Sequence, residues 1–270
     1  MSTLGEIKQN TNLWSIVTSI IFGLSACTSR LPIQQPGKVS TCSEPGTIGR
    51  ERIPHPTQGF NISFQYYLPP CYETLKTSRF PVIYLNTVLF ESRLDDKDNT
   101  PMSLADRLIR AGKMPPAILV MPDDIIDFGY NTALAIDLIA YVDYKFNTIP
   151  ERQYRGVGGI SYGGAIAARM AFQFPDVFGS LGILSGGIAS GEKGRFDDWI
   201  NTNLSGIWPR VRMDVGDQDG GILPLTQNLV DVLHQNGIAY SMNIEPGNHN
   251  WTFWLSRMES YLLWFAEAWK

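Results

Sequence analysis

The 270-residue chain contains few of the residues that build metal centres or nucleic-acid surfaces. It has three cysteines and three histidines, without the Cys-x-x-Cys or His-x-x-x-His spacing that would predict a metal site. Its 22 lysines and arginines are outnumbered by 26 aspartates and glutamates, and they form no basic cluster, which argues against a nucleic-acid partner. Repeats and low-complexity segments are also lacking. We therefore expect a globular protein that binds neither a metal nor nucleic acid.

The apolar run at residues 13–24 is short for a membrane-spanning helix and suits a signal sequence. It ends in Leu-Ser-Ala-Cys at residues 24–27, which resembles a bacterial lipoprotein box. In such a box the cysteine is lipidated and becomes the mature N-terminus. We therefore expect Cys27 to carry lipid, and the protein to be exported and anchored to a membrane at the bacterial cell envelope. An ordinary cleaved signal peptide is the alternative.

The polar, Pro- and Gly-containing residues 28–45 have the composition of a tether. Cys42 lies near the end of this tether, and Cys71 ends an expected early strand. Because an exported compartment permits disulfides, we expect a bridge between Cys42 and Cys71, with two free thiols as the alternative. The chain is then divided into a signal peptide (1–27), the tether, and one globular domain (46–270).

Expected strands and helices alternate along this domain. The apolar runs at residues 117–121 and 182–184 are typical of parallel strands buried on both faces. The alternation predicts an α/β fold, a three-layer α/β/α sandwich with a mostly parallel central sheet. Strands are expected at residues 62–68, 81–85, 117–121, 154–158, 182–185, 210–215 and 241–245. Helices are expected at residues 102–111, 132–146, 163–173, 224–236 and 252–267.

The most informative motif lies at residues 159–163, which read Gly-Ile-Ser-Tyr-Gly and match the G-x-S-x-G of a nucleophile elbow. In that turn a strand runs into a helix, and the serine Oγ is exposed above the helix N-terminus. Five residues alone are a weak signal, but here an expected strand precedes them and an expected helix follows. The motif therefore predicts Ser161 as a nucleophile, with a glycine-rich loop and an incidental serine as the alternative.

A serine nucleophile needs a base, and three histidines allow a choice by elimination. His55 precedes the serine in a Pro-rich stretch, and His234 lies within an expected amphipathic helix. His249 lies in a polar loop between a strand and the last helix, where it fits the chain order serine, acid, histidine of α/β-hydrolases. The sequence therefore predicts His249 as the general base.

Three aspartates compete to be the acid that orients this histidine. Asp214 lies inside an expected strand, whereas Asp217 begins the following turn and can cap it through its side chain. Asp219 lies deeper in the loop, from where its carboxylate can reach the imidazole. We therefore favour Asp219, with Asp217 as the alternative.

In this order the motifs resemble the family named Putative esterase, an α/β-hydrolase group that includes S-formylglutathione hydrolases, feruloyl esterase domains and mycolyltransferases. The resemblance covers residues 45–268 and supports the choice of Asp219. It implies an α/β-hydrolase domain, no cofactor, and a small-molecule or polysaccharide-linked ester as substrate. Its motifs are G-G-x-S-x-G-G at residues 158–164, P-D-x-F-G at 175–179, G-x-x-D at 216–219 and G-x-H-x-W-x-x-W at 247–254.

One segment departs from that family's pattern. After the strand at residues 81–85 such enzymes usually carry His-Gly, and backbone N–H groups just beyond form half of the oxyanion hole. This chain has Asn86, Thr87 and Val88 there, and the missing glycine restricts the backbone. We expect one donor from the Tyr162 N–H and the other from the N–H of Thr87 or Val88. The Asn86 side-chain amide is an alternative.

The sequence thus predicts an exported, lipid-anchored serine esterase. Two other functions remain open. An acyltransferase would use the same three residues, with an alcohol outcompeting water for the acyl-enzyme. A non-catalytic surface binding protein is the second, and the altered turn after residue 85 is its only support in the sequence.

Overall fold

The computed structural model describes residues 42, 44–54, 61–75, 77–87, 99–123 and 132–269, which belong to the compact unit Gln34–Lys270. An eight-stranded sheet crosses this unit in the order β1-β2-β4-β3-β5-β6-β7-β8. The strands β3 to β8 are parallel, and the antiparallel β1 and β2 extend the sheet beyond β4. The strands are β1 (Thr47–Pro54), β2 (Asn61–Leu68), β3 (Val82–Asn86), β4 (Ile118–Pro122), β5 (Arg155–Ile160), β6 (Ser180–Leu184), β7 (Arg210–Gly216) and β8 (Ser241–Glu245).

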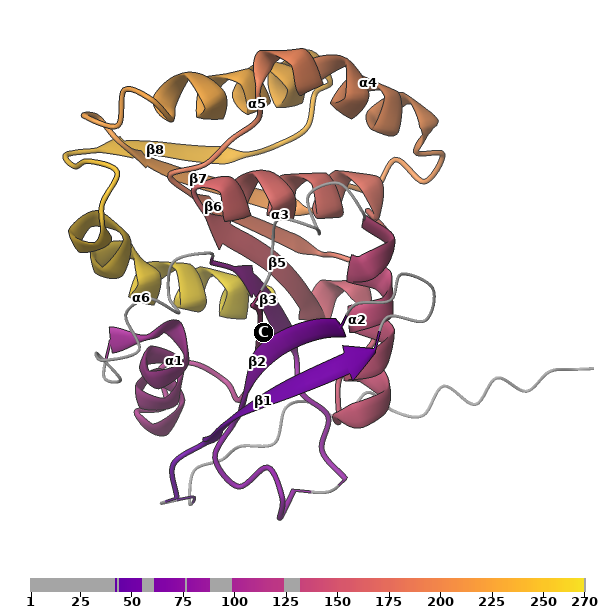
Figure 1. Ribbon diagram of the computed structural model, residues 1–270, viewed down its shortest axis with the longest axis vertical. Helices are drawn as coiled ribbons and strands as arrows, with labels where there is room; N and C mark the ends of the chain where they lie inside the picture. The colour runs from indigo at the N-terminus through magenta and orange to yellow at the C-terminus, as the bar shows by residue number, and fades with distance from the viewer. Residues whose placement is uncertain are drawn as a thin grey trace, which may run out of the picture. The chain divides into compact units, whose positions relative to one another are not determined.

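Helices cover both faces of the sheet, which makes the three-layer α/β sandwich that the sequence predicts (Figure 1). Helices α1 and α6 pack on one face, and α2, α3 and α5 pack on the other. Helix α4 rests against α3 and α5. The helices are α1 (Pro101–Arg110), α2 (Thr132–Lys145), α3 (Tyr162–Gln173), α4 (Lys193–Thr202), α5 (Leu223–Gln235) and α6 (Trp251–Glu267), with short 3-10 turns at Arg152–Tyr154 and Ser190–Glu192.

The central strands send successive side chains into two separate cores. In β3, Val82 and Tyr84 join the core under α2 and α3, whereas Ile83 and Leu85 join the core under α1 and α6. This alternation follows from the two-residue period of a strand. Because both faces are covered, every residue of β3, β4, β5 and β6 is buried, which explains why apolar residues and glycines dominate these strands.

Two elements were not predicted from the sequence. Strand β1 lies at the edge of the sheet and alternates exposed and partly buried residues, many of them charged, so it lacks an apolar signal. It exists because it pairs with β2 along its whole length. Helix α4 has Phe196 as its one fully buried residue. Its apolar residues at helical spacing span only Phe196 to Ile200, which is too short a stretch to mark a helix by periodicity alone.

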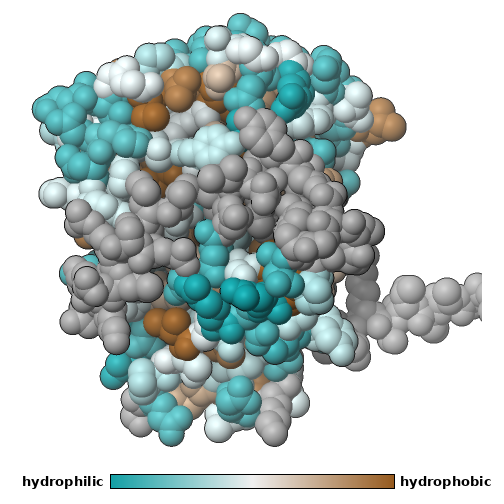
Figure 2. All heavy atoms as spheres, in the orientation of Figure 1, coloured by the Kyte–Doolittle hydropathy of each residue, from teal (hydrophilic) through white to brown (hydrophobic). Residues whose placement is uncertain are grey.

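The surface of the described residues is mixed. On the face shown in Figure 2, hydrophobic residues form small separate areas among hydrophilic ones, as is normal for a protein surface. None of the helices in the described ranges is both long and apolar enough to cross a bilayer. The signal sequence, the lipid on Cys27 and most of the tether concern residues outside those ranges.

Cys42 and Cys71 form the expected disulfide, with their Cα atoms 6.0 Å apart and a sequence separation of 29. The bridge encloses the β1–β2 hairpin in a covalent loop. Replacing both cysteines by serine should lower the free energy of unfolding by about 3 kcal/mol, because the bridge limits the freedom of the unfolded chain. Urea unfolding measures this loss, and the wild-type protein under reducing conditions should match the variant. Equal midpoints with and without the bridge would contradict the prediction.

Candidate active site

Ser161 forms a sharp turn between β5 and α3. Its backbone has φ 56° and ψ −125°, a left-handed φ that is costly for a residue other than glycine. Two hydrogen bonds hold the turn: the Ser161 N–H donates to the Leu184 carbonyl at 3.0 Å, and the Gly164 N–H donates to the Ser161 carbonyl at 2.9 Å. The serine is thereby fixed at the carboxyl edge of the parallel strands, where open α/β sheets bind their ligands.

The turn can close only because two of its residues have no side chain. A Cβ at Gly163 would lie 1.8 Å from the backbone oxygen of Asn86, and a Cβ at Gly159 would lie 2.2 Å from the backbone oxygen of Gly163. Backbone atoms cannot rotate away from such contacts. The glycines of the motif are therefore required by the close packing of β3, β5 and α3.

Gly163→Ala should consequently destabilise the protein by about 1–3 kcal/mol, the usual cost of overpacking a core. Gly194→Ala in α4 is the matched control, since a Cβ there would meet nothing within 4 Å. Thermal unfolding should show a clearly lower midpoint for Gly163→Ala than for Gly194→Ala. Similar midpoints for the two variants would mean that the start of α3 can move away from β3 at little cost.

The structure brings Ser161, His249 and Asp219 together. Ser161 Oγ lies 2.9 Å from His249 Nε2, and His249 Nδ1 lies 2.8 Å from Asp219 Oδ2. The Asp219 side chain is 2% exposed and the His249 side chain 35% exposed. A hydroxyl bonded to an imidazole whose second nitrogen faces a buried carboxylate can lose its proton to that imidazole.

The other candidates for acid and base lie elsewhere. Asp214, inside β7, pairs with Arg212 at 2.8 Å. Asp217 is exposed, and its Oδ1 accepts the Gly247 N–H at 3.0 Å, so it caps a turn as its sequence position allows. His234 is exposed on α5, and His55 lies outside the described residues.

Asp219 and His249 sit on two neighbouring segments that are bonded to each other. We call residues 216–221 the acid turn and residues 246–250 the base loop. The Asp217 N–H donates to the Glu245 carbonyl at 2.9 Å, and the Gln218 N–H donates to the Gly247 carbonyl at 3.0 Å. The Asn248 side-chain amide adds a bond to Gln218 Oε1 at 3.1 Å. Sequence reasoning missed this role of residues 217 and 218, which fix the distance between acid and base.

Aromatic side chains form the wall behind the base. The His249 ring meets the Trp254 ring edge-on, with centroids 4.9 Å apart and planes at 87°. Trp254 is 2% exposed, and Trp251 packs against it with ring centroids 5.4 Å apart. The imidazole is thus held on one side by a rigid surface, which restricts the orientations it can take.

The expected oxyanion donors occupy two adjoining segments. Tyr162 is the first residue of α3, so its N–H has no carbonyl partner within the helix and lies at the positive end of the helix dipole. Thr87 directly follows β3, next to Asn86, which pairs with Gly159 of β5. Thr87 is buried, and its Oγ1 has no hydrogen-bond partner in the described part of the chain. Val88 lies outside the described residues.

The alternative that the Asn86 amide serves as a donor is wrong. Asn86 is fully buried, and its Nδ2 points into the core, where it donates to the Gly158 carbonyl at 3.3 Å and approaches Met170 Sδ at 3.8 Å. The side chain therefore links β3 to β5 and α3. It belongs to the packing beneath the turn and does not face the serine.

Beside the serine, the Tyr162 side chain is held in place by contact with a charged side chain. The Tyr162 ring is 37% exposed and lies under the Arg169 guanidinium, 5.5 Å from its centroid. Arg169 pairs with Glu192 at 2.8 Å. Burial is the strongest single influence and opposes ionisation of Glu192, but the hydrogen bonds from Arg169 and the Ala189 N–H, together with the charges of Arg169 and Arg195, outweigh it and hold the pKa of Glu192 below its ordinary value. Among the described residues, no three His, Cys, Asp or Glu side chains are grouped to hold a metal ion.

Two curated bacterial proteins are similar to this chain in sequence. The uncharacterized protein YbbA of Bacillus subtilis is 24% identical over 59% of this chain and 70% of its own length. The endo-1,4-beta-xylanase/feruloyl esterase of Xylanibacter ruminicola is 31% identical over 45% of this chain. The match covers only 19% of that much longer enzyme, so most of it has no counterpart here.

Solved structures share the fold. The feruloyl esterase module from Clostridium thermocellum, an S954A mutant complexed with sinapinate, has a TM-score of 0.69 at 19% identity, over 87% of this chain and 94% of its own. The S-formylglutathione hydrolase from Staphylococcus aureus has a TM-score of 0.66 at 15% identity, over 83% of this chain and 99% of its own. These likenesses establish an α/β-hydrolase fold.

The sequence profile of the family described as Putative esterase matches residues 128–265, just over half of the chain. The matched region contains the serine turn, the acid turn and the base loop. The sheet order, the bonded Ser161–His249–Asp219 set and this match agree with one another. The chain therefore belongs to the Putative esterase family and is a carboxylic ester hydrolase with the α/β-hydrolase fold.

Proposed function

We propose that this protein is a serine esterase that hydrolyses carboxylic esters through an acyl-enzyme on Ser161. The observation that carries the proposal is the unbroken hydrogen-bonded series from Ser161 Oγ through the His249 ring to Asp219. It joins three segments far apart in sequence at the carboxyl edge of one sheet. Such an arrangement has no evident structural purpose, because the serine backbone is strained and the His249 ring is partly exposed.

The reaction follows from the positions of these groups. Ser161 Oγ attacks the ester carbonyl carbon while His249 Nε2 takes its proton, and Asp219 stabilises the imidazolium that forms. The N–H of Tyr162 and the N–H of either Thr87 or Val88 donate to the oxyanion. His249 then gives the proton to the departing alcohol, which leaves the acyl group on Ser161. Water, deprotonated by His249, releases the acid and restores the serine.

A fluorophosphonate probe tests this proposal directly. It should label the wild-type protein covalently and leave Ser161→Ala unlabelled, and mass spectrometry of the labelled peptide should identify Ser161. Labelling of both proteins would show that the nucleophile lies elsewhere. A folded wild-type protein that fails to react would favour the non-catalytic binding protein instead.

For the substrate we propose an ester of an aromatic acid, such as a hydroxycinnamate attached to a sugar or polysaccharide. The support is the feruloyl esterase in the names of similar proteins, together with the aromatic pair Trp251 and Trp254 beside the base. Methyl ferulate and methyl sinapinate should therefore be cleaved with a higher kcat/KM than methyl esters of short aliphatic acids. A preference for the aliphatic esters would contradict this choice while leaving the esterase in place.

We also propose that the enzyme acts outside the cytoplasm, held to the cell envelope by lipid on Cys27. The support is the sequence at residues 24–27 and the Cys42–Cys71 disulfide, which is typical of oxidising compartments. The full-length protein should partition into detergent, and Cys27→Ala should abolish that partitioning or block maturation. Unchanged partitioning of Cys27→Ala would exclude the lipid anchor.

A further inference from the structure

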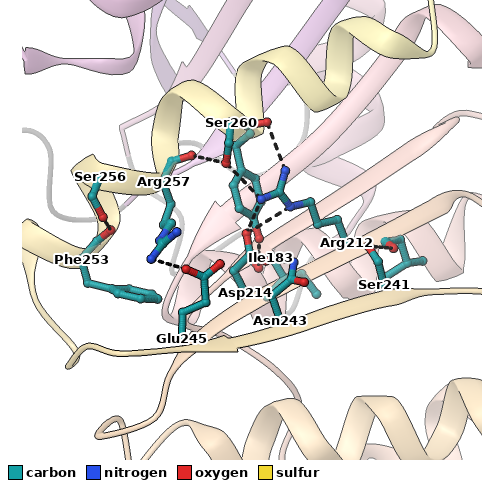
Figure 3. Close-up of polar contacts among 12 residues, drawn as sticks. Ile183, Arg212, Asp214, Ser241, Asn243, Glu245, Phe253, Ser256, Arg257 and Ser260 are labelled. Atoms are coloured by element: carbon teal, nitrogen blue, oxygen red, sulfur yellow. Dashed lines mark hydrogen bonds and ion pairs between the residues drawn. The ribbon is translucent and has the colours of Figure 1, made fainter.

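An ion pair connects the strand before the base loop to the helix after it. Glu245 is the last residue of β8, and Arg257 lies in the second turn of α6; Arg257 Nη2 contacts Glu245 Oε2 (Figure 3). The side chains of Glu245 and Arg257 are 34% and 27% exposed. The pair therefore brackets the base loop, the segment that carries His249.

Arg257 also reaches the loop through an aromatic ring. Its guanidinium lies 5.5 Å from the centroid of Phe253, a cation–π contact. The same ring lies against Gly247, where a Cβ would come within 2.3 Å of Phe253 Cδ2. On its other side Gly247 is bonded to Asp217 and Gln218 of the acid turn. The contacts from the Arg257 guanidinium through the Phe253 ring to Gly247 thus link α6 to the acid turn.

A second polar cluster fixes the same elements further from the base loop (Figure 3). Asp214 of β7 pairs with Arg212 at 2.8 Å and accepts a hydrogen bond from Asn243 of β8. Arg212 also donates to the Ser260 carbonyl of α6 at 3.1 Å. Because this cluster ties β7, β8 and α6 together, loss of the Glu245–Arg257 pair should disturb the loop while leaving the elements in place.

We propose that Glu245 and Arg257 are positioning residues for His249, an inference that rests on the proposed function. They act through Phe253 and the base loop without touching the reacting atoms. A displacement of about 1 Å at the chemistry can cost about 10²-fold in rate, whereas a partly exposed ion pair contributes little to stability. The pair should therefore affect turnover far more than folding.

Glu245→Gln and Arg257→Met should each lower kcat for an activated aryl ester by about tenfold, with KM unchanged, because a transition-state geometry is lost and no substrate contact is removed. The double variant should be no slower than Arg257→Met alone, since Glu245→Gln removes only the ion pair that Arg257→Met has already removed. Arg257→Lys keeps the charge and should retain most of the rate.

Glu259→Gln is the matched control. It breaks another ion pair of α6, with Lys113 at 3.5 Å, that does not bracket the base loop, so kcat should not change. Thermal midpoints of the Glu245, Arg257 and Glu259 variants should differ little. If Arg257→Met fails to fold, the nearly isosteric Glu245→Gln and the charged Arg257→Lys still provide the comparison.

Equal kcat values for Glu245→Gln, Arg257→Met and Glu259→Gln would overturn the inference. A rise in KM with unchanged kcat in the Glu245 and Arg257 variants would overturn it as well. A Ser161→Ala variant assayed beside them separates this result from failure of the proposed function. If Ser161→Ala is inactive while the ion-pair variants turn over at the wild-type rate, only the positioning role is wrong. If Ser161→Ala remains active, the proposed function is wrong as well.

Discussion

Ser161→Ala should lower kcat for an activated ester by about 10⁶-fold, because removing a nucleophile that works as one unit with its base removes nearly all of that unit's contribution. His249→Ala should lose a similar factor. Asp219→Asn should lose about 10⁴-fold, since the asparagine amide favours the wrong imidazole tautomer. Steady-state hydrolysis of an aryl ester measures all three, with thermal unfolding to verify that each variant folds.

Asp217→Asn is the matched control for the acid. Asp217 accepts one backbone N–H of the base loop, which an asparagine oxygen can also accept, so the rate should change little. A crippling effect of Asp217→Asn together with a silent Asp219→Asn would reverse the assignment of the acid. Full activity of Ser161→Ala would remove the acyl-enzyme mechanism altogether.

Thr87→Pro should lower kcat by about 10²–10³-fold, because proline has no N–H with which to bind the oxyanion. The preceding residue, Asn86, is in a strand, a conformation that a following proline favours, so the substitution should be tolerated by the backbone. Thr87→Ala keeps the N–H and is the control for loss of the side chain. Rates of hydrolysis and binding of a transition-state analogue should fall together in Thr87→Pro.

Val88→Pro tests the neighbouring N–H in the same assay. If Val88→Pro is slow and Thr87→Pro is not, the donor is Val88. If both variants keep the wild-type rate, neither N–H binds the oxyanion, and stabilisation must come from the Tyr162 N–H together with a donor from another segment.

The sequence predicted those parts of the site that are encoded within short segments. The turn at Ser161 requires Gly159 and Gly163 next to it. These glycines make the turn recognisable in the sequence, because no other residue fits their backbone contacts. The buried strands β3 and β4 could be predicted from the sequence because both of their faces are apolar. His249 followed from elimination among three histidines, which would not have been possible in a histidine-rich chain.

The parts that the sequence did not predict depend on contacts between distant segments. The sequence left Asp217 open as an alternative to Asp219. The side chains of two aspartates two residues apart can point in different directions, and a sequence pattern does not show those directions. Burial of the Asn86 amide depends on the position of α3 behind β3. The pairing of Glu245 with Arg257 is likewise invisible in sequence, since each looks like an ordinary surface charge until β8 and α6 are brought together.

The Cys42–Cys71 disulfide determines where a pulling force on the residues before Cys42 would enter the domain. Without it, tension would reach β1, an edge strand paired with β2 alone, and could peel that ladder apart one residue pair at a time. With it, tension crosses covalently from Cys42 to Cys71 and bypasses the whole β1–β2 hairpin. The force then passes along the chain to β3, which is clamped between β4 and β5 inside the sheet. Without the bridge, the force can separate β1 from β2 one pair at a time. With the bridge, the force has to pull the buried central strand β3 out of the sheet against all of its hydrogen bonds to β4 and β5 at once.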